Sequence, residues 1–278
     1  MAERRFRRRG AVVAAGVAAC AVGAVSGCGS GHGAALDDGR GEEAVEVVRR
    51  AASALVDARS SKARTSMEMA TGGTRVTIRG EGVYDFRRHV GRLKVLLPQD
   101  PAGDSSRPIT ELLAPGALFM KNRGAGVPAD KWVRVETASM SDGNLVTGGA
   151  TDPFAAAELL LGAEAVSYVG EEQVGGADVT HYRGTADLRR AAELASDGSR
   201  DSLAAAAKGF ATSKVPFDVY LDDEGRIRKV RHRFSFVNGQ QKDAVDVAST
   251  TLLFDFGVPV VVRLPDRDDI YAGRIAEE

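Results

Sequence analysis

The chain has 278 residues, of which 44% are hydrophobic and 27% charged, the balance of a soluble globular protein with one large or two small domains. Its 37 basic and 38 acidic residues leave a net charge of −1, which argues against a nucleic-acid-binding protein that depends on bulk positive charge. The charge is unevenly distributed along the chain. Residues 1–27 contain five arginines and one glutamate, a balance of +4, so the remainder carries −5.

Residues 1–27 have the layout of a secretory signal peptide. A basic start is followed by the uncharged residues 11–25, which are small or apolar, and then by Ser26 and Gly27 before Cys28. A membrane-spanning helix would need about 20 strongly apolar residues. This run is shorter and consists mainly of Ala, Val and Gly, so the segment is predicted to be a signal peptide that is removed after export.

The cleavage region resembles a bacterial lipobox, with Val25 in the place where that pattern usually has Leu. The resemblance implies that Cys28 receives a thioether-linked diacylglycerol, with acyl chains of the palmitate kind, and becomes the first mature residue. Two acyl chains hold a protein at a membrane more firmly than one, since each buried methylene contributes about 0.8 kcal/mol. The arginine-rich start leaves the export route open between the general secretory and twin-arginine systems.

The cysteines agree with this interpretation. Of the two in the chain, Cys20 lies in the segment expected to be removed and Cys28 would begin the mature protein, so no disulfide is expected. Residues 28–41 are rich in glycine and are predicted to be a lipidated flexible tether. Residues 42–278 show no repeat, linker or change of composition, and they are predicted to form a single domain.

An amphipathic helix is predicted to begin near Glu42, because Val45, Val48 and Leu55 recur at helical spacing. From about Met67 the hydrophobic period shortens to that of β-strands. Strands and one proline-containing loop are then predicted in chain order, the strands over residues 74–78, 82–86, 89–97, 112–113, 117–121 and 131–136 and the loop over residues 98–108.

The second half of the chain begins with a clear helix start at Asp152 and Pro153, an N-cap acceptor followed by a proline in the first turn. This helix should run over residues 154–161 and end at Gly162. The remaining predicted elements are strands over 165–169 and 178–185, helices over 187–194 and 202–210, and an antiparallel meander over 215–221, 226–237 and 244–256. Together these elements predict an α+β domain.

The sequence carries no catalytic or metal-binding motif. The four histidines share no local spacing with a carboxylate or a second ligand, and the zinc-protease, serine-hydrolase and phosphate-loop patterns are absent. Residues 222–225 lack the ligand alternation of a calcium loop and are predicted to form a hairpin turn. His232 shares a strand face with Val230 and Phe234 and is interpreted as a core or rim histidine. An enzyme, a metal site and a cofactor are therefore not expected.

Five segments carry a resemblance to a known family. They are residues 131–135 (KWVRV), 169–172 (VGEE), 181–184 (HYRG), 217–222 (FDVYLD) and 254–260 (FDFGVPV). In these segments and in the order of its elements, most of the chain from residue 42 onward resembles the actinobacterial lipoproteins of the LppX/LprG type. It is more distantly similar to the LolA carrier fold. The resemblance implies a curved antiparallel sheet, a half-barrel, with helices on its concave face and a cavity between them for acyl chains.

The function expected from this resemblance is that of a lipoprotein anchored at the extracytoplasmic face of the cell membrane. It would bind or carry lipid acyl chains, with a lipid or lipoglycan as ligand, the membrane and a membrane transporter as partners, and no nucleic acid. The alternative is a ligandless interaction or sensor module of the cell envelope on the same fold. The residues expected to contact lipid are the cover residues Leu159, Leu160 and Leu161 and the strand residues Val230, Phe234 and Phe236.

Alternate residues of a strand point to opposite faces, so each strand of the meander offers an inward set and an outward set. The candidate inward sets are Val219 with Leu221, Val230 with Phe234 and Phe236, and Leu252 with Phe254 and Phe256. A shift of one residue exchanges the two faces of a strand, so the sequence leaves open which sets point into the cavity.

Overall fold

The computed structural model describes residues 32–71, 74–98, 107–124, 126–237 and 244–272. In this part of the chain eleven strands form one antiparallel sheet. They are β1 (Ser60–Thr71), β2 (Thr74–Asp85), β3 (Val90–Leu96), β4 (Ile109–Ala114), β5 (Ala117–Lys121), β6 (Val133–Glu136), β7 (Ala163–Val174), β8 (Ala177–Asp187), β9 (Lys214–Leu221), β10 (Ile227–Val237) and β11 (Ala244–Phe254).

The strand order is β6-β5-β4-β3-β2-β1-β11-β10-β9-β8-β7. Within each half of the sheet, neighbours in space are also neighbours in sequence. Only the pairing of β1 with β11 joins distant parts of the chain, with Lys62 opposite Phe254. The first strand and the last strand therefore hold the two halves of the sheet together, and they lie at its centre.

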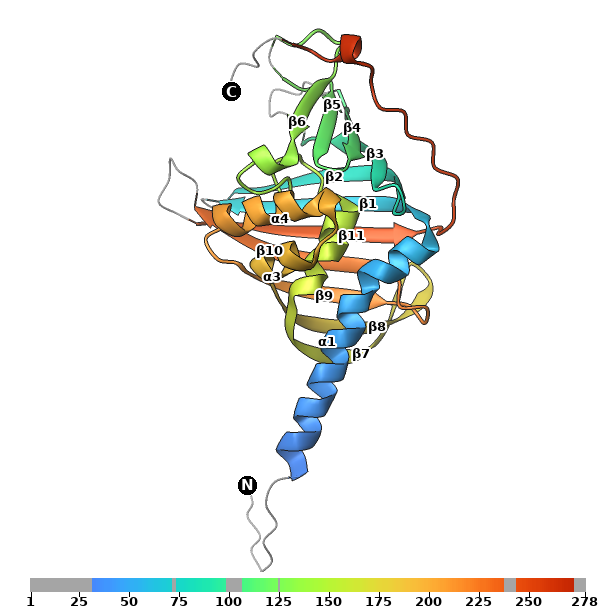
Figure 1. The fold of residues 1–278 in the computed structure, drawn as a ribbon, viewed down its shortest axis with the longest axis vertical. Helices are drawn as coiled ribbons and strands as arrows, with labels where there is room; N and C mark the ends of the chain where they lie inside the picture. Colours follow the sequence, from blue (N-terminus) through green and yellow to red (C-terminus); the bar gives the residue numbers. More distant parts are fainter. Residues whose placement is uncertain (1–31, 72–73, 99–106, 125, 238–243, 273–278) are drawn as a thin grey trace, which may run out of the picture.

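The main helices lie on one face of this sheet (Figure 1). They are α1 (His32–Ala58), α2 (Pro153–Glu158), α3 (Leu188–Leu194) and α4 (Asp197–Gly209), with short 3-10 turns η1 (Thr137–Ser139), η2 (Leu159–Gly162) and η3 (Arg267–Asp269). The sheet curves around the helices without closing, and register shifts in the β7–β8 and β9–β10 pairs add local bends. The curved α+β half-barrel expected from the resemblance is confirmed.

Alternation of side chains separates the two faces of the sheet. On β1, Ala63 and Met67 are buried on the concave face, whereas Lys62, Arg64 and Glu68 are exposed on the convex face. The same alternation runs through β3, whereas residues 217–221 of β9 are buried on both faces. One hydrophobic cluster beneath the helices includes residues from α1, from both halves of the sheet and from α2 to α4.

The C-terminal segment covers the convex face at the opposite end of the sheet from α1. After β11 the chain leaves along one side and reaches β6, where the backbone N–H of Trp132 donates to the carbonyl of Asp269 at 2.8 Å (Figure 1). Val262 of this segment packs in a second small cluster with Val90, Leu112 and Phe119. This cover explains why β4 and β5 carry apolar residues on both faces.

Several expectations from the sequence are confirmed at the level of single elements. The side chain of Asp152 accepts hydrogen bonds from the backbone N–H groups of Phe154 and Ala155 at 2.7 and 3.1 Å, the N-cap that begins α2. Residues 222–225 form the β9–β10 turn, in which Asp222 accepts from the backbone of Arg226 at 2.9 Å. The meander from β9 to β11 is present as expected.

Three expectations differ from the structure. The two strands expected over residues 74–78 and 82–86 form one continuous strand, β2. Helix α1 begins at His32 and not near Glu42, so residues 32–41, expected as part of a tether, are helical. Alanine and leucine at positions 34–36 favour helix, whereas the glycines that suggested a tether each disfavour it by about 1 kcal/mol. Strand β1 was also not expected over its full length. Residues 1–31, with Cys28 and the expected signal peptide, and most of the expected loop at 98–108 lie outside the described residues.

Candidate functional site

The concave face of the sheet is the surface on which the sequence placed the lipid-contacting residues. Leu159 and Leu160 of η2 are fully buried beneath the surface of the helical layer, and Leu161 is partly buried. These leucines follow α2 directly, and the helical segment formed by α2 and η2 ends at Gly162. The expected cover segment therefore lies in the layer over the concave face.

Two of the strand residues expected at the site point inward. Val230 and Phe234 of β10 are buried, and they belong to the same hydrophobic cluster as Leu159 and Leu160. The backbone of Phe236 is opposite Val245 of β11 in the strand register. The sequence left open which residues of the two neighbouring strands point inward, and the structure answers this. Val219 and Leu221 of β9 are buried on the concave face. Leu252 and Phe254 of β11 lie on the convex face.

The layer between sheet and helices is occupied by protein side chains. The four open hollows found among the described residues have volumes of about 790, 450, 890 and 280 Å³. The hollow of about 890 Å³ lies on the outside of α3 and α4. The other three lie on the convex side or at the end of the sheet. None of these four is the cavity expected between the concave face and its cover.

A buried loop, residues 141–151, fills the concave face beside α2. Asp142 organises it by accepting backbone hydrogen bonds from Val146 at 2.7 Å and Thr147 at 2.6 Å. Leu145 and Val146 are buried within the main hydrophobic cluster. This loop and the short segment α2–η2 occupy the space in which the sequence led us to expect a cavity.

A cluster of polar side chains interrupts the apolar concave face at its centre. Thr65 lies opposite Thr251 across the β1–β11 pair, and His232 lies opposite Ser249 across the β10–β11 pair. The hydroxyl groups of Ser249 and Thr151 are 2.6 Å apart, and that of Thr151 also donates to the carbonyl of Leu145 at 2.8 Å. We refer to Thr65, Thr151, His232, Ser249 and Thr251 as the central polar cluster; all five residues are buried.

Two atoms of the central polar cluster have no hydrogen-bond partner among the described residues, the Oγ1 of Thr65 and the Nε2 of His232. Burial lowers the pKa of His232 to about 3, so its ring is neutral at ordinary pH. Buried polar atoms in folded proteins nearly always have a partner. A bound molecule could therefore supply the hydrogen-bond partner that each of these two atoms lacks.

A buried carboxyl group lies farther along the same face. Glu111 of β4 is fully buried opposite Leu93 and Met120, and neither of its carboxylate oxygens has a partner among the described residues. Burial raises its pKa to about 8, an effect that the charge of Arg123 only partly offsets. The group is therefore largely protonated at neutral pH. The alternation Ile109, Glu111, Leu113 placed this acid on an apolar face, a signal that sequence analysis missed.

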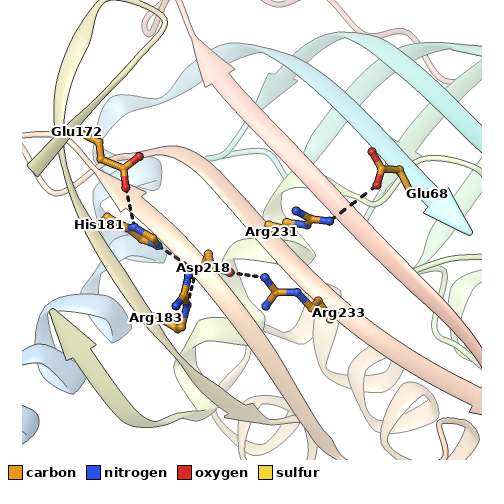
Figure 2. A network of polar contacts seen from close by, with 7 residues as sticks. All are labelled: Glu68, Glu172, His181, Arg183, Asp218, Arg231 and Arg233. Atoms are coloured by element: carbon orange, nitrogen blue, oxygen red, sulfur yellow. Dashed lines mark hydrogen bonds and ion pairs between the residues drawn. The ribbon is translucent and has the colours of Figure 1, made fainter. Parts of the chain in front are cut away.

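A charged network lies on the convex face of the four strands β7 to β10 (Figure 2). Asp218 is buried and accepts hydrogen bonds from Arg183 and Arg233, both at 2.8 Å, and it lies 2.9 Å from Nε2 of His181. The other ring nitrogen of His181 is 2.9 Å from Glu172. Although burial opposes ionisation of Asp218, these hydrogen bonds lower its pKa. The network pairs cations with carboxylates across four strands, and its residues Glu172, His181, Arg183, Asp218 and Arg233 include no hydroxyl or thiol nucleophile.

The described ranges contain no group of three or more His, Cys, Asp or Glu residues arranged to hold a metal ion. Among the helices of residues 32–71, 74–98, 107–124, 126–237 and 244–272, none is long and apolar enough to cross a membrane. The two faces of the sheet therefore differ in their polar groups. The concave face has buried polar atoms without partners, and the convex face carries charged side chains, some of which form ion pairs.

Comparison with solved structures finds several proteins to which the chain is similar. The chain is similar to the lipoprotein LppX of Mycobacterium tuberculosis, with 12% identity and a TM-score of 0.48 over 80% of this chain and 99% of that one. It is similar to LprF of Mycobacterium bovis, with 13% identity and a TM-score of 0.41 over 81% and 97%. It is also similar to a LolA-superfamily protein of Nitrosomonas europaea, with 11% identity and a TM-score of 0.34 over 84% and 98%.

No family model and no curated protein matches the chain. At identities of 11 to 13% a likeness of this kind concerns the fold alone. The LppX-type lipoproteins and LolA-superfamily proteins that the sequence resembles are the groups to which the structure is similar.

Proposed function

We propose that the protein is a lipoprotein of the cell envelope that binds acyl chains between the concave face of its sheet and the covering helices, without catalysing a reaction. The observation that supports this proposal most strongly is a set of unpartnered polar atoms in a largely apolar buried layer, among them the Thr65 hydroxyl and the His232 Nε2. An unsatisfied buried polar atom costs about 1–3 kcal/mol. A guest with oxygen atoms at that point would remove the cost.

A lipid ester fits this arrangement in both of its parts. The hydroxyl of Thr65 can donate to an ester carbonyl, and the neutral ring of His232 can donate or accept according to its tautomer. The acyl chains would occupy the space that Leu159, Leu160 and the loop 141–151 fill in this structure. Apolar contacts are not directional, so an acyl chain can take the place of a side chain without loss of hydrogen bonds.

The covering segment is suited to such a displacement. It consists of a helix of six residues and a 3-10 turn of four, so it retains few internal hydrogen bonds of its own. Its buried side chains are mostly apolar, among them Phe154, Leu159 and Leu160, and Glu158 accepts hydrogen bonds from Ser196 at 2.8 and 3.0 Å. Short elements with few internal hydrogen bonds are among the parts of a protein that open most easily.

A second candidate is a ligandless interaction or sensor module of the envelope. The filled concave layer favours it, because in that case the packed state would be the working state. The two candidates differ in one observable property. Only the lipid-binding protein should carry lipid through purification and release it into a solvent extract or a native mass spectrum.

The substitution Thr65→Val tests the lipid-binding proposal. Valine has nearly the same shape and no hydroxyl, so the variant should be at least as stable as the parent. It should nevertheless bind a fluorescent diacylglycerol about fivefold more weakly, since one neutral hydrogen bond is lost. Binding is measured by fluorescence titration and stability by thermal unfolding.

Thr77→Val is the matched control, because Thr77 lies on the convex face of β2 and should not affect binding. Equal affinity of parent and Thr65→Val, together with no lipid in the native mass spectrum of the parent, would refute acyl binding and support the interaction module.

We also propose that Cys28 is lipidated and holds the protein at the extracytoplasmic face of the cell membrane. The change Cys28→Ser should leave export intact and release the protein into the medium, because the acyl chains are lost. The test is to fractionate the cells and to measure, with an antibody against the protein, how much of it is in the membrane fraction and how much in the medium. Retention of the variant in the membrane fraction would show that residues 11–25 remain as a membrane segment.

A further inference from the structure

A hollow on the convex face lies over the outer side of β1, β2 and β3. It has a volume of about 790 Å³ and is open to solvent. Its lining combines cations with apolar groups, and the residues that matter here are Lys62, Arg64, Arg92, Lys94 and Phe254. We call it the convex groove.

The cations of the convex groove are mostly unpaired. Among the described residues, only Lys62 has an ion-pair partner, Asp255 at 2.9 Å. Arg64 lies over the ring of Phe254 at 4.8 Å and makes no ion pair there, and none is found for Arg92 or Lys94. Unpaired cations held close together on a rigid sheet favour an anion that can contact several of them.

The register of the strands explains why these cations gather. Arg64 of β1 lies opposite Glu81 of β2, and Glu81 lies opposite Lys94 of β3. Lys62 and Arg92 flank Val83 in the next row of the same face. Glu81 is therefore the one acidic residue in these two rows beside four cations, of which Lys62 pairs with Asp255, and the groove keeps a positive balance.

Charge is segregated on this face of the molecule. The convex positions of β1, β2 and β3 carry six cations and three anions, a balance of +3, although the chain after residue 27 carries −5. The six cations are Lys62, Arg64, Arg75, Arg79, Arg92 and Lys94, and the three anions are Glu68, Glu81 and Asp85. A positive surface on an acidic protein attracts anionic partners selectively.

Apolar side chains lie directly beside these charges. A second hollow of about 280 Å³ shares Arg64 and Glu81 with the convex groove and is bordered by Leu96 and Leu252. Leu96 is 45% exposed, and the next residue, Leu97, is 36% exposed. Exposed leucines adjacent to arginine and lysine are typical of surfaces that contact the interface of an anionic membrane.

We propose that the convex groove binds the phosphate-bearing headgroup of an anionic membrane lipid. The phosphate would lie among Arg64, Arg92 and Lys94, while Leu96 and Leu97 contact the region next to the acyl chains. This site is on the opposite face of the sheet from the proposed acyl-binding layer and does not depend on it. It would set the orientation of the body of the protein at a lipid surface.

The test uses the full chain with Cys28→Ser and vesicles of phosphatidylglycerol or phosphatidylcholine. The parent should bind the phosphatidylglycerol vesicles more tightly, with affinity falling as salt is added. The double variant Arg64→Gln and Lys94→Gln should bind them about 30-fold more weakly, at about fivefold for each cation near a charged surface. The matched control, Arg189→Gln and Lys208→Gln on α3 and α4, should change binding less than twofold.

Two further arms separate a lipid from free phosphate. Leu96→Ser should weaken vesicle binding, and millimolar inorganic phosphate should not displace the parent from vesicles. If phosphate displaces it and Leu96→Ser binds normally, the ligand is a soluble phosphate and the membrane-lipid proposal is overturned. Equal loss in the double variant and in its control would overturn the convex groove as the site.

Discussion

The free energy of unfolding is expected to have a plateau between about pH 4.5 and 6.5 and to fall on both sides of it. Two buried groups of the concave layer produce this shape, Glu111 and His232. Their pKa values shift in opposite directions from 4.5 and 6.5, to about 8 and about 3. Stability changes with pH wherever the folded and unfolded chains bind different numbers of protons.

Glu111 accounts for the alkaline side. Between pH 4.5 and 8 the folded state keeps its proton while the unfolded state has lost it, so the folded state binds more protons and stability falls as pH rises. His232 has the opposite effect between pH 3 and 6.5, where the unfolded state binds the extra proton and stability rises with pH. From pH 4.5 to 6.5 the two slopes cancel.

Outside the plateau one slope acts alone, so the parent should lose roughly 2 kcal/mol between pH 6.5 and 8. On the acid side a similar loss is expected from pH 4.5 to 3. The lowered pKa values of Asp187 and Asp218 add to that acid loss, because both carboxylates are stabilised in their charged form. Burial raises the pKa of Asp152, which acts in the opposite direction.

Two single variants separate the contributions. Glu111→Gln should remove the alkaline fall, so that stability rises up to pH 6.5 and then stays level. His232→Gln should remove the contribution of His232 to the loss of stability at acid pH. The free energy of unfolding of this variant should then fall from pH 4.5 upward. Urea unfolding at half-unit pH intervals gives the three curves. A parent profile that Glu111→Gln leaves unchanged above pH 6.5 would show that this carboxyl group is not held neutral in the folded state.

The features that sequence analysis predicted well are those with local causes. The start of α2 needs only Asp152 and Pro153, and the β9–β10 hairpin needs only the acidic turn that ends in Gly225. The overall arrangement came from a resemblance in the order of elements. None of these predictions required knowledge of which distant strands pair in the sheet.

Strand β1 was missed for a physical reason. Its inward positions include Ser61, Ala63 and Thr65, which are small or polar, so the strand shows no apolar alternation until Met67. These residues are buried only because β1 pairs with β11, a contact between residues nearly 200 positions apart. The central polar cluster depends on the same pairing, so its members could not be recognised as neighbours in the sequence.

The filling of the concave layer by the loop at residues 141–151 has a similar origin. The sequence showed an apolar face and a cover, and both are present. It did not show that residues 141–151 fold inward and fill the remaining space. That loop is held by backbone contacts with α4, which no hydrophobic pattern records.

Gly209→Ala should destabilise the protein more than any surface substitution, by about 3 kcal/mol or more. Gly209 is the last residue of α4, and a methyl group there would overlap the backbone carbonyl of Ser141. Gly143 makes the reciprocal contact, because its added methyl group would overlap the carbonyl of Ser202. A backbone cannot move aside as a flexible side chain can, so helix and loop would have to separate.

Gly41→Ala is a matched control with the opposite sign. Gly41 also lies in a helix, α1, but the nearest atom to an added methyl group is the carbonyl oxygen of Val166 at 4.0 Å. Alanine there should stabilise the protein by up to about 1 kcal/mol, since it favours the helix. Thermal unfolding of the parent and both variants decides the matter. If Gly209→Ala unfolds at the temperature of the parent, α4 is not packed against the loop, and the loop does not fill the concave face as described.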